Sequence, residues 1–92
     1  MTDVIHNEAA GRYELTEDAA TAFASYVRDG DVLVFDHTVT PPELRGRGIA
    51  SRLVKAALAD VRAKGLRIVP ACSFVAEYVA RHPEEGGLVI TL

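Results

Sequence analysis

The 92-residue sequence predicts an α+β fold, a single domain over residues 1–92 in which two helices pack on a mixed β-sheet in the order ββββαβαβ. Three observations predict it. The first half of the chain carries short runs of β-branched and aromatic residues separated by turn signals. The second half carries a long segment with apolar residues at helical spacing. A strand, a helix and another strand follow one another there, which implies a right-handed parallel crossover.

Four strands are expected before residue 40. The strongest signal is Asp29-Gly30, a typical hairpin turn between two apolar runs. The run before it is rich in alanine, which favours a helix, but its aromatic and β-branched residues and the hairpin indicate a strand. The run after it is apolar enough for a central strand that is buried on both faces. The expected strands are Asp3–Glu8, Arg12–Leu15, Ala20–Arg28 and Asp31–Val39.

A long amphipathic helix is expected over Gly48–Lys64, after Pro41-Pro42 has ended the fourth strand. Its apolar residues form one helical face, and Gly65 is the expected C-cap. These apolar residues are Ala50, Leu53, Val54, Ala57, Leu58 and Val61. The remaining expected elements are a strand over Leu66–Ala71, a helix over Phe74–His82 capped by Ser73, a turn at Gly86-Gly87 and a final strand over Leu88–Leu92.

Composition excludes several classes of protein. Hydrophobic residues make up 49% of the chain and there is no low-complexity tract, which indicates a folded globule. The first twenty residues carry no apolar block, and the apolar runs are too short for a membrane span, so neither a targeting peptide nor a membrane contact is expected. Cys72 is the single cysteine and cannot form an internal disulfide, which favours a reducing cytoplasm. No metal site is predicted.

Charge is distributed unevenly along the chain. Residues 45–67 hold seven basic side chains and one acidic one, Asp60, for a segment charge of +6. The rest of the chain has three basic and twelve acidic residues and carries −9. A local basic patch on an acidic protein suits a compact anion better than a long polyanion such as a nucleic acid.

The segment between the fourth strand and the long helix has the features of a phosphate-binding loop. Gly46 and Gly48 allow the backbone to approach a ligand, and Arg45 and Arg47 add positive charge. The backbone N–H groups of Arg45–Ala50 would converge at a helix N-terminus, where the helix dipole favours an anion. The alternative is a tight strand-to-helix turn with solvated arginines. Neither a dinucleotide fingerprint, which needs glycine in place of Ser51, nor a Gly-Lys-Ser/Thr nucleotide loop is present.

These residues resemble the GNAT superfamily of acetyl-CoA-dependent N-acetyltransferases. The resemblance rests on the strand VLVFDHTV and the loop PPELRGRGIASRLV, with Glu43 at a position that is usually Gln or Arg. More narrowly, the chain looks like small single-domain members that are truncated relative to larger ones. The motifs shared with these small members lie at His37–Pro41, Arg45–Ala50, Pro70–Ser73 and Arg81–Pro83, and the resemblance covers residues 3 to 92.

The resemblance implies acetyl-CoA as the acyl donor and an amine as the acceptor. The loop, including Ile49 and Ala50, would hold the CoA diphosphate through its backbone amides. The backbone of Thr38, Val39 and Thr40 would pair with the pantetheine arm. Cys72 would lie beside the acetyl thioester, and Ser73 would line the same groove.

Two residues are candidates for the chemistry. His37 is a candidate general base for the amine, because a lysine-like amine is protonated at neutral pH. Simple alternation places His37 on one face with Leu33 and Phe35, which would make it a packed core histidine, but the resemblance implies a bulge in this strand that breaks the alternation. Cys72 at a helix start could accept the acetyl group covalently, line the site or fill the core.

A third candidate, Tyr78, corresponds to the tyrosine that protonates the thiolate in larger members. It is displaced by one residue from the equivalent position, Val79, so a core aromatic is favoured.

The resemblance also implies an open acceptor side. Larger members insert two helices between the first strands and end in a hairpin, and both close over the acceptor, whereas this chain has neither. An open groove would suit a bulky or macromolecular amine, or would be completed by a second subunit in a homodimer. Three other functions remain open: a non-catalytic CoA-binding regulatory module, a nucleic-acid-binding domain and a Cys–His hydrolase that uses Cys72 and His37.

Overall fold

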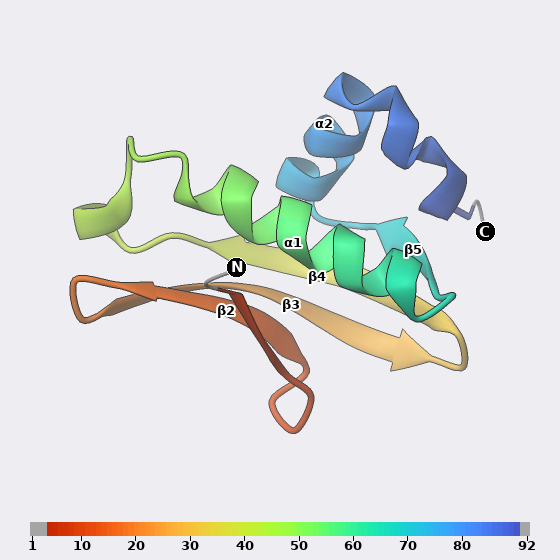
Figure 1. Ribbon diagram of the computed structural model, residues 1–92, viewed down its shortest axis with the longest axis horizontal. Coiled ribbons are helices and arrows are strands. Elements are labelled where there is room, and N and C mark those ends of the chain that lie inside the picture. The colour runs from red at the N-terminus through yellow and green to blue at the C-terminus, as the bar shows by residue number, and fades with distance from the viewer. Residues whose placement is uncertain (1–3, 91–92) are drawn as a thin grey trace.

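The computed structural model describes residues 4–90 and confirms the α+β class. Five strands form one sheet in the order β1-β2-β3-β4-β5, in which β1 to β4 are antiparallel and β5 runs parallel to β4 (Figure 1). Between β4 and β5 the chain crosses over through helix α1. The elements are β1 (Val4–Asn7), β2 (Arg12–Glu17), β3 (Ala20–Asp29), β4 (Val32–Val39), the 3-10 helix η1 (Pro42–Leu44), α1 (Ile49–Ala63), β5 (Arg67–Pro70), α2 (Ser73–Arg81) and the 3-10 helix η2 (Pro83–Leu88).

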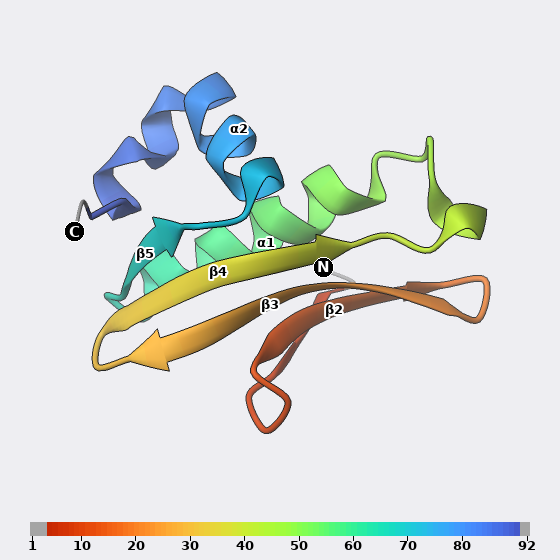
Figure 2. The same cartoon turned by 180° about the vertical axis from the view of Figure 1, so that it is seen from behind.

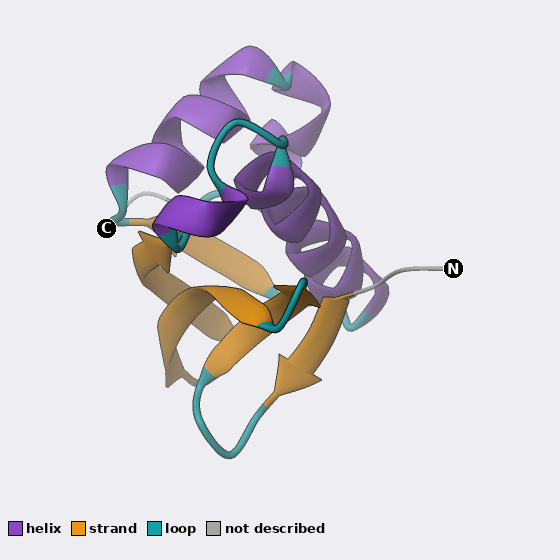
Figure 3. Cartoon of the chain, turned by 90° about the vertical axis from the view of Figure 1, so that its left-hand side faces the viewer, coloured by secondary structure: helices purple, strands orange, loops and turns teal. Residues whose placement is uncertain are grey.

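Both helices lie on one side of the sheet (Figures 1 and 2), and the end view in Figure 3 shows them gathered above the strands. The fully buried face of α1, which includes Leu53 and Leu58, therefore packs on alternate strand residues such as Leu15 and Phe35. No helix covers the opposite side of the sheet within residues 4–90. We call that side the open face. No helix among the described residues is long and apolar enough to cross a membrane.

Strand β4 is central, as predicted, because β3 and β5 flank it. The expectation that both of its faces are buried is wrong. Leu33 and Phe35 are 1% exposed beneath the helices, whereas Val32 and Val34 on the open face are only half-buried. Burial on both faces requires helices on both sides of a sheet, and here both helices lie on the same side.

A β-bulge interrupts β4. Tyr26 pairs with Phe35 and Ser25 pairs with His37, so Asp36 is an extra residue without a partner on β3. The bulge shifts the side-chain alternation by one residue. His37 therefore lies on the open face, is exposed, and does not share a face with Phe35 as simple alternation predicts. The interpretation of His37 as a packed core histidine is wrong.

The ends of the helices agree with the sequence except at one cap. After α1, the N–H of Gly65 bonds to the carbonyl of Arg62 at 3.1 Å and that of Leu66 to Val61 at 3.0 Å, which is the helix end predicted around Gly65. Ser73, however, is the first helical residue of α2 and not its N-cap. Cys72 occupies the cap with extended backbone angles, and no side chain within residues 4–90 caps this helix start.

The C-terminal segment differs from the prediction. The expected turn at Gly86-Gly87 lies within η2, a 3-10 helix. The expected strand Leu88–Leu92 is reduced to a single parallel bridge between Val89 and Ile68, beside which the N–H of Ile90 donates to the Ile68 carbonyl at 3.0 Å. Asp3, Thr91 and Leu92, which belong to predicted strands, lie outside the described residues.

A cluster of polar side chains around His6 connects β1 to the end of α1. The ring of His6 stacks on Tyr13 with centroids 4.1 Å apart, its Nε2 lies 2.6 Å from the Tyr26 hydroxyl, and its Nδ1 lies 3.0 Å from Nζ of Lys64. Since an ammonium group can only donate, Nδ1 accepts and Nε2 carries the proton. Burial and the charge of Lys64 lower the pKa of His6, although Asp60 and Glu8 partly oppose this.

We therefore expect the free energy of unfolding to fall as the pH drops from 7.5 to 5.5. The unfolded chain takes up a proton on His6 near its ordinary pKa of about 6.5, while the folded chain resists protonation, so acid favours unfolding. Urea unfolding at several pH values measures this. His6→Phe keeps the stacked ring and removes the titration, so its unfolding free energy should change less over the same range. An equal pH dependence in both proteins would contradict the role of His6.

Candidate functional site

The loop from Thr40 to Gly48 joins the end of β4 to the start of α1. Leu44, at the end of η1, is fully buried and anchors the loop in the core. Gly46 and Gly48 have φ angles of +81° and +70°, in the left-handed region that other residues rarely adopt. Apart from its chain neighbours, a Cβ atom added at either glycine would meet no atom of the described residues within 4 Å, so the space in front of the loop is open. The two glycines are therefore required by the backbone, and they border open space.

The start of α1 presents unused hydrogen-bond donors. Gly48 is the N-cap, and the first helical bond runs from the N–H of Arg52 to the Gly48 carbonyl at 3.1 Å. The N–H groups of Ile49, Ala50 and Ser51 precede this bond and have no acceptor within the helix. No side chain among the described residues caps them. With the helix dipole behind them, these groups suit an anion.

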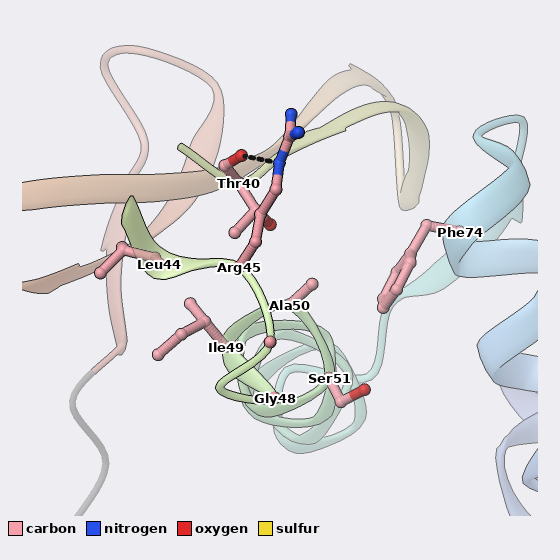
Figure 4. Close-up of a pocket in the computed structure, with 9 residues that line it drawn as sticks. Thr40, Leu44, Arg45, Gly48, Ile49, Ala50, Ser51 and Phe74 are labelled. Atoms are coloured by element: carbon pink, nitrogen blue, oxygen red, sulfur yellow. Dashed lines mark hydrogen bonds between the residues drawn. The ribbon is translucent and has the colours of Figure 1, made fainter. Parts of the chain in front are cut away.

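A pocket of about 230 Å³ lies at this helix start. Figure 4 shows Phe74 of α2 facing Ala50 and Ser51 of α1 across it, with Arg45 above and hydrogen-bonded through Nε to the Thr40 carbonyl at 3.4 Å. The residues that line it are Thr40, Leu44, Arg45, Gly46, Gly48, Ile49, Ala50, Ser51 and Phe74. One pocket thus contains most of the loop residues proposed from sequence. Leu44 and Ser51 were not proposed as site residues, although their places beside the glycines were visible in the sequence.

Arg47 is directed away from this pocket. Its guanidinium lies 2.6 Å from Asp18, in the turn between β2 and β3, and 3.5 Å from Glu17, the last residue of β2. Arg52 also lies 3.5 Å from Glu17. The hydrogen bond that Arg47 donates to the Asp18 carboxylate raises the pKa of Arg47. Arg47 therefore links the loop to the β2–β3 hairpin through ion pairs, whereas Arg45 remains beside the pocket.

Other basic residues of the +6 segment are also paired with acids. Arg62 contacts Glu85, and Lys64 lies 2.9 Å from Asp60. Together with the ion pairs of Arg47, these contacts neutralise much of the positive charge that the sequence predicts for this segment.

At the far end of the site, Cys72 contacts β4 twice. Its N–H donates to the Phe35 carbonyl at 2.8 Å, and its Sγ lies 3.4 Å from the Thr38 hydroxyl. Burial opposes ionisation of the thiol, but hydrogen bonds from Thr38 and from the backbone of Val75 and Phe74 outweigh it and lower the pKa of Cys72. Ser73, next to it, is exposed. Cys72 is thus a half-buried thiol whose pKa lies below its ordinary value.

The two candidate reactive residues lie on opposite faces of β4. Thr38, which contacts Cys72, faces the helices, whereas His37 and Val39 are exposed on the open face. Within the described residues no hydrogen bond joins His37 to Cys72. Tyr78 is 9% exposed in the core and stacks on His82, and burial raises its pKa, which agrees with the core role favoured from sequence.

Comparison with known proteins places this arrangement in a family. The family model of the GCN5-related N-acetyl-transferases matches residues 12–88, from β2 to the end of η2. The chain belongs to this family. The NMR solution structure of a GCN5-like protein from Staphylococcus aureus is 25% identical, with a TM-score of 0.74, and the match covers 100% of this chain and 93% of that one. The match extends over the whole chain, so the two proteins share the same overall fold.

Proposed function

We propose that the protein is an acetyl-CoA-dependent N-acetyltransferase that transfers an acetyl group to an amine. The observation that carries the proposal is the uncapped start of α1 behind two glycines with positive φ, because such a site holds a diphosphate. Family membership supports it. Starting from the protonated amine, the reaction joins the nitrogen to the acetyl carbon, breaks the carbon–sulfur bond of the thioester and releases CoA thiol and one proton.

Different residues in and beside the pocket would bind different parts of CoA. The N–H groups of Gly48, Ile49, Ala50 and Ser51 would receive the diphosphate, and Arg45 would add charge at its edge. Phe74 offers an apolar surface to the pantetheine arm, whose amides would pair with the backbone of Thr38–Thr40. The thioester would then lie near Cys72, which forms hydrogen bonds with Phe35 and Thr38 of β4. Cys72 either accepts the acetyl group or lines the site, and His37 takes the proton from the amine.

The decisive test is acetyl transfer with a library of amines, followed by the release of CoA thiol and by mass spectrometry of the protein. An enzyme releases CoA faster with one class of amine, and a covalent route adds one acetyl group to Cys72 that Cys72→Ala lacks. Saturable CoA binding without transfer to any amine would instead support a non-catalytic CoA-binding module. The protein is proposed to act in the cytoplasm, without nucleic acid or membrane partners.

We expect Arg45→Ala to weaken CoA binding about tenfold and Arg47→Ala to weaken it less than about twofold. Arg45 can reach a phosphate beside the pocket, and a charge-assisted hydrogen bond is worth about 1.5–3 kcal/mol. Arg47 is already paired with Asp18 on an exposed surface, where a salt bridge contributes about 0–1 kcal/mol. Isothermal titration with CoA measures both affinities. An equal loss in both variants would show that Arg47 leaves its ion pair to bind CoA.

The acceptor side of the proposed enzyme is open. The protein would therefore act on a bulky or macromolecular amine as a monomer, or a second subunit would complete the groove in a homodimer. Light scattering with and without CoA distinguishes these two arrangements.

A further inference from the structure

We propose that Asp36 binds the ammonium group of the acceptor on the open face of the sheet, next to His37. This inference rests on the proposed function and names the side and the chemical class of the acceptor. Asp36 is the extra residue of the bulge in β4 and has no pairing partner on β3. Bulges redirect side chains and often occur beside active sites.

The bulge brings three polar side chains together. On β3, Ala24 is fully buried beneath the helices, so its neighbour Ser25 points to the open face. The Ser25 hydroxyl donates to Oδ1 of Asp36 at 2.7 Å, which places this carboxylate on the same face. His37 pairs directly with Ser25 and is exposed there. A carboxylate, a hydroxyl and an imidazole therefore share one spot on the open face.

Asp36 retains the capacity to bind a cation. It is half-buried, and within residues 4–90 it forms no ion pair. Two other acidic side chains of the strands and of α1 are matched, because Glu14 pairs with Arg12 at 2.5 Å and Asp60 with Lys64 at 2.9 Å. The Ser25 hydroxyl occupies one oxygen of the carboxylate and orients the group. The second oxygen remains for a donor with positive charge, which a primary ammonium group supplies.

Apolar side chains flank this polar spot. The register pairs Phe23 with Val39 on one side of it and Val27 with Val34 on the other. Val39 and Val27 are 42% and 59% exposed. An ammonium group at Asp36 would thus be flanked by apolar surface, which fits an amine carried on an aliphatic chain, such as a lysine side chain or an alkylamine.

The position also suits the reaction. Phe35 and Thr38, on either side of Asp36 and His37, are the two β4 residues that contact Cys72. The acceptor would therefore reach the end of β4 from the face opposite the thiol. His37 removes one proton from the bound ammonium group, and the neutral amine attacks the thioester carbonyl carbon. The carbon–sulfur bond then breaks, the nitrogen loses its second proton to give the amide, and the CoA thiolate takes up one proton.

The first experiment does not depend on catalysis. Titration of the ¹⁵N-labelled protein with n-butylammonium chloride should shift the amide signals of residues 25, 36 and 37, with n-butanol and sodium chloride as ligand controls. Asp36→Asn keeps the shape and removes the charge, and should weaken this binding at least about fivefold. Asp31→Asn, at an exposed position in the turn just before β4, is the matched control and should bind as the wild type does. Equal binding by Asp36→Asn, or shifts centred elsewhere, would overturn the inference.

The second experiment uses an alkylamine that the enzyme acetylates. Asp36→Asn should raise the KM for the amine about tenfold, with the Kd for CoA unchanged, and Asp36→Glu should recover part of the loss. An unchanged KM in Asp36→Asn would contradict the inference. If the wild-type protein binds the ammonium ion through Asp36 but transfers no acetyl group to any amine, the proposed function fails while the ammonium site stands.

Discussion

Gly46→Asp is expected to weaken CoA binding by at least about 100-fold. The substitution places a carboxylate in the loop that is proposed to hold the diphosphate. At roughly 4 Å and an effective dielectric constant of about 20, each pair of like charges costs about 4 kcal/mol, and about 2.7 kcal/mol already corresponds to 100-fold. The φ angle of +81° adds backbone strain for any side chain. Isothermal titration with CoA measures the loss.

The chain offers a matched control for this variant. Gly30, in the turn between β3 and β4, also has a positive φ, +62°, and also faces open space. Gly30→Asp therefore introduces the same charge and similar strain away from the loop, and should leave CoA affinity within about twofold. Gly46→Ala separates strain from charge. Unchanged affinity in Gly46→Asp would show that CoA does not bind at this loop.

His37→Ala is expected to lower kcat/KM for acetyl transfer by about 100-fold or more, the usual contribution of a general base. CoA affinity and the thermal midpoint should change little, because the side chain of His37 is exposed and away from the core. The measurement compares kcat/KM with CoA affinity from titration. Added imidazole should restore part of the rate, since an exposed site admits a small base.

His82→Ala is the control for this second variant. His82 stacks on Tyr78 at the end of α2, with ring centroids 4.1 Å apart, so its loss tests histidine removal away from β4. It should affect stability more than kcat/KM. If His37→Ala transfers acetyl groups at the wild-type rate, the base is another group or water.

The separation of His37 and Cys72 bears on the mechanism. A Cys–His hydrolase needs the thiol and its base within hydrogen-bond reach, and the two lie on opposite faces of β4 without a hydrogen bond in the described structure. The same separation is compatible with acetyl transfer, in which donor and acceptor approach from different sides. Cys72 would then act on the donor side and His37 on the acceptor side.

Much of the fold follows from local sequence patterns. The hairpin predicted from Asp29-Gly30, the apolar face of α1 and the helix end at Gly65 depend on residues close together in the chain. The structure contains all three, although the two residues of the hairpin turn are Gly30 and Asp31, one position later than predicted. The last strand was predicted from an apolar run, but η2 takes up its first residue, Leu88. The conformation of this C-terminal segment depends on how it packs against the core, and a local sequence pattern contains no information about that packing.

The loop between β4 and α1 is the part of the site that the sequence determined by itself. Two glycines, a buried strand before them and a helical pattern after them are sufficient to predict positive φ angles and free amides at a helix start. These are properties of neighbouring residues, and the structure has both.

Only the tertiary structure decided on which face of the sheet each candidate side chain lies and which arginine borders the pocket. The bulge at Asp36 arises from the pairing of β4 with β3, and it turns His37 and Asp36 to the open face. The ion pair of Arg47 with Asp18 joins residues 29 positions apart and directs that arginine away from the pocket. Strand register and long-range ion pairs depend on residues distant in sequence, so no pattern within a single strand or loop could determine them.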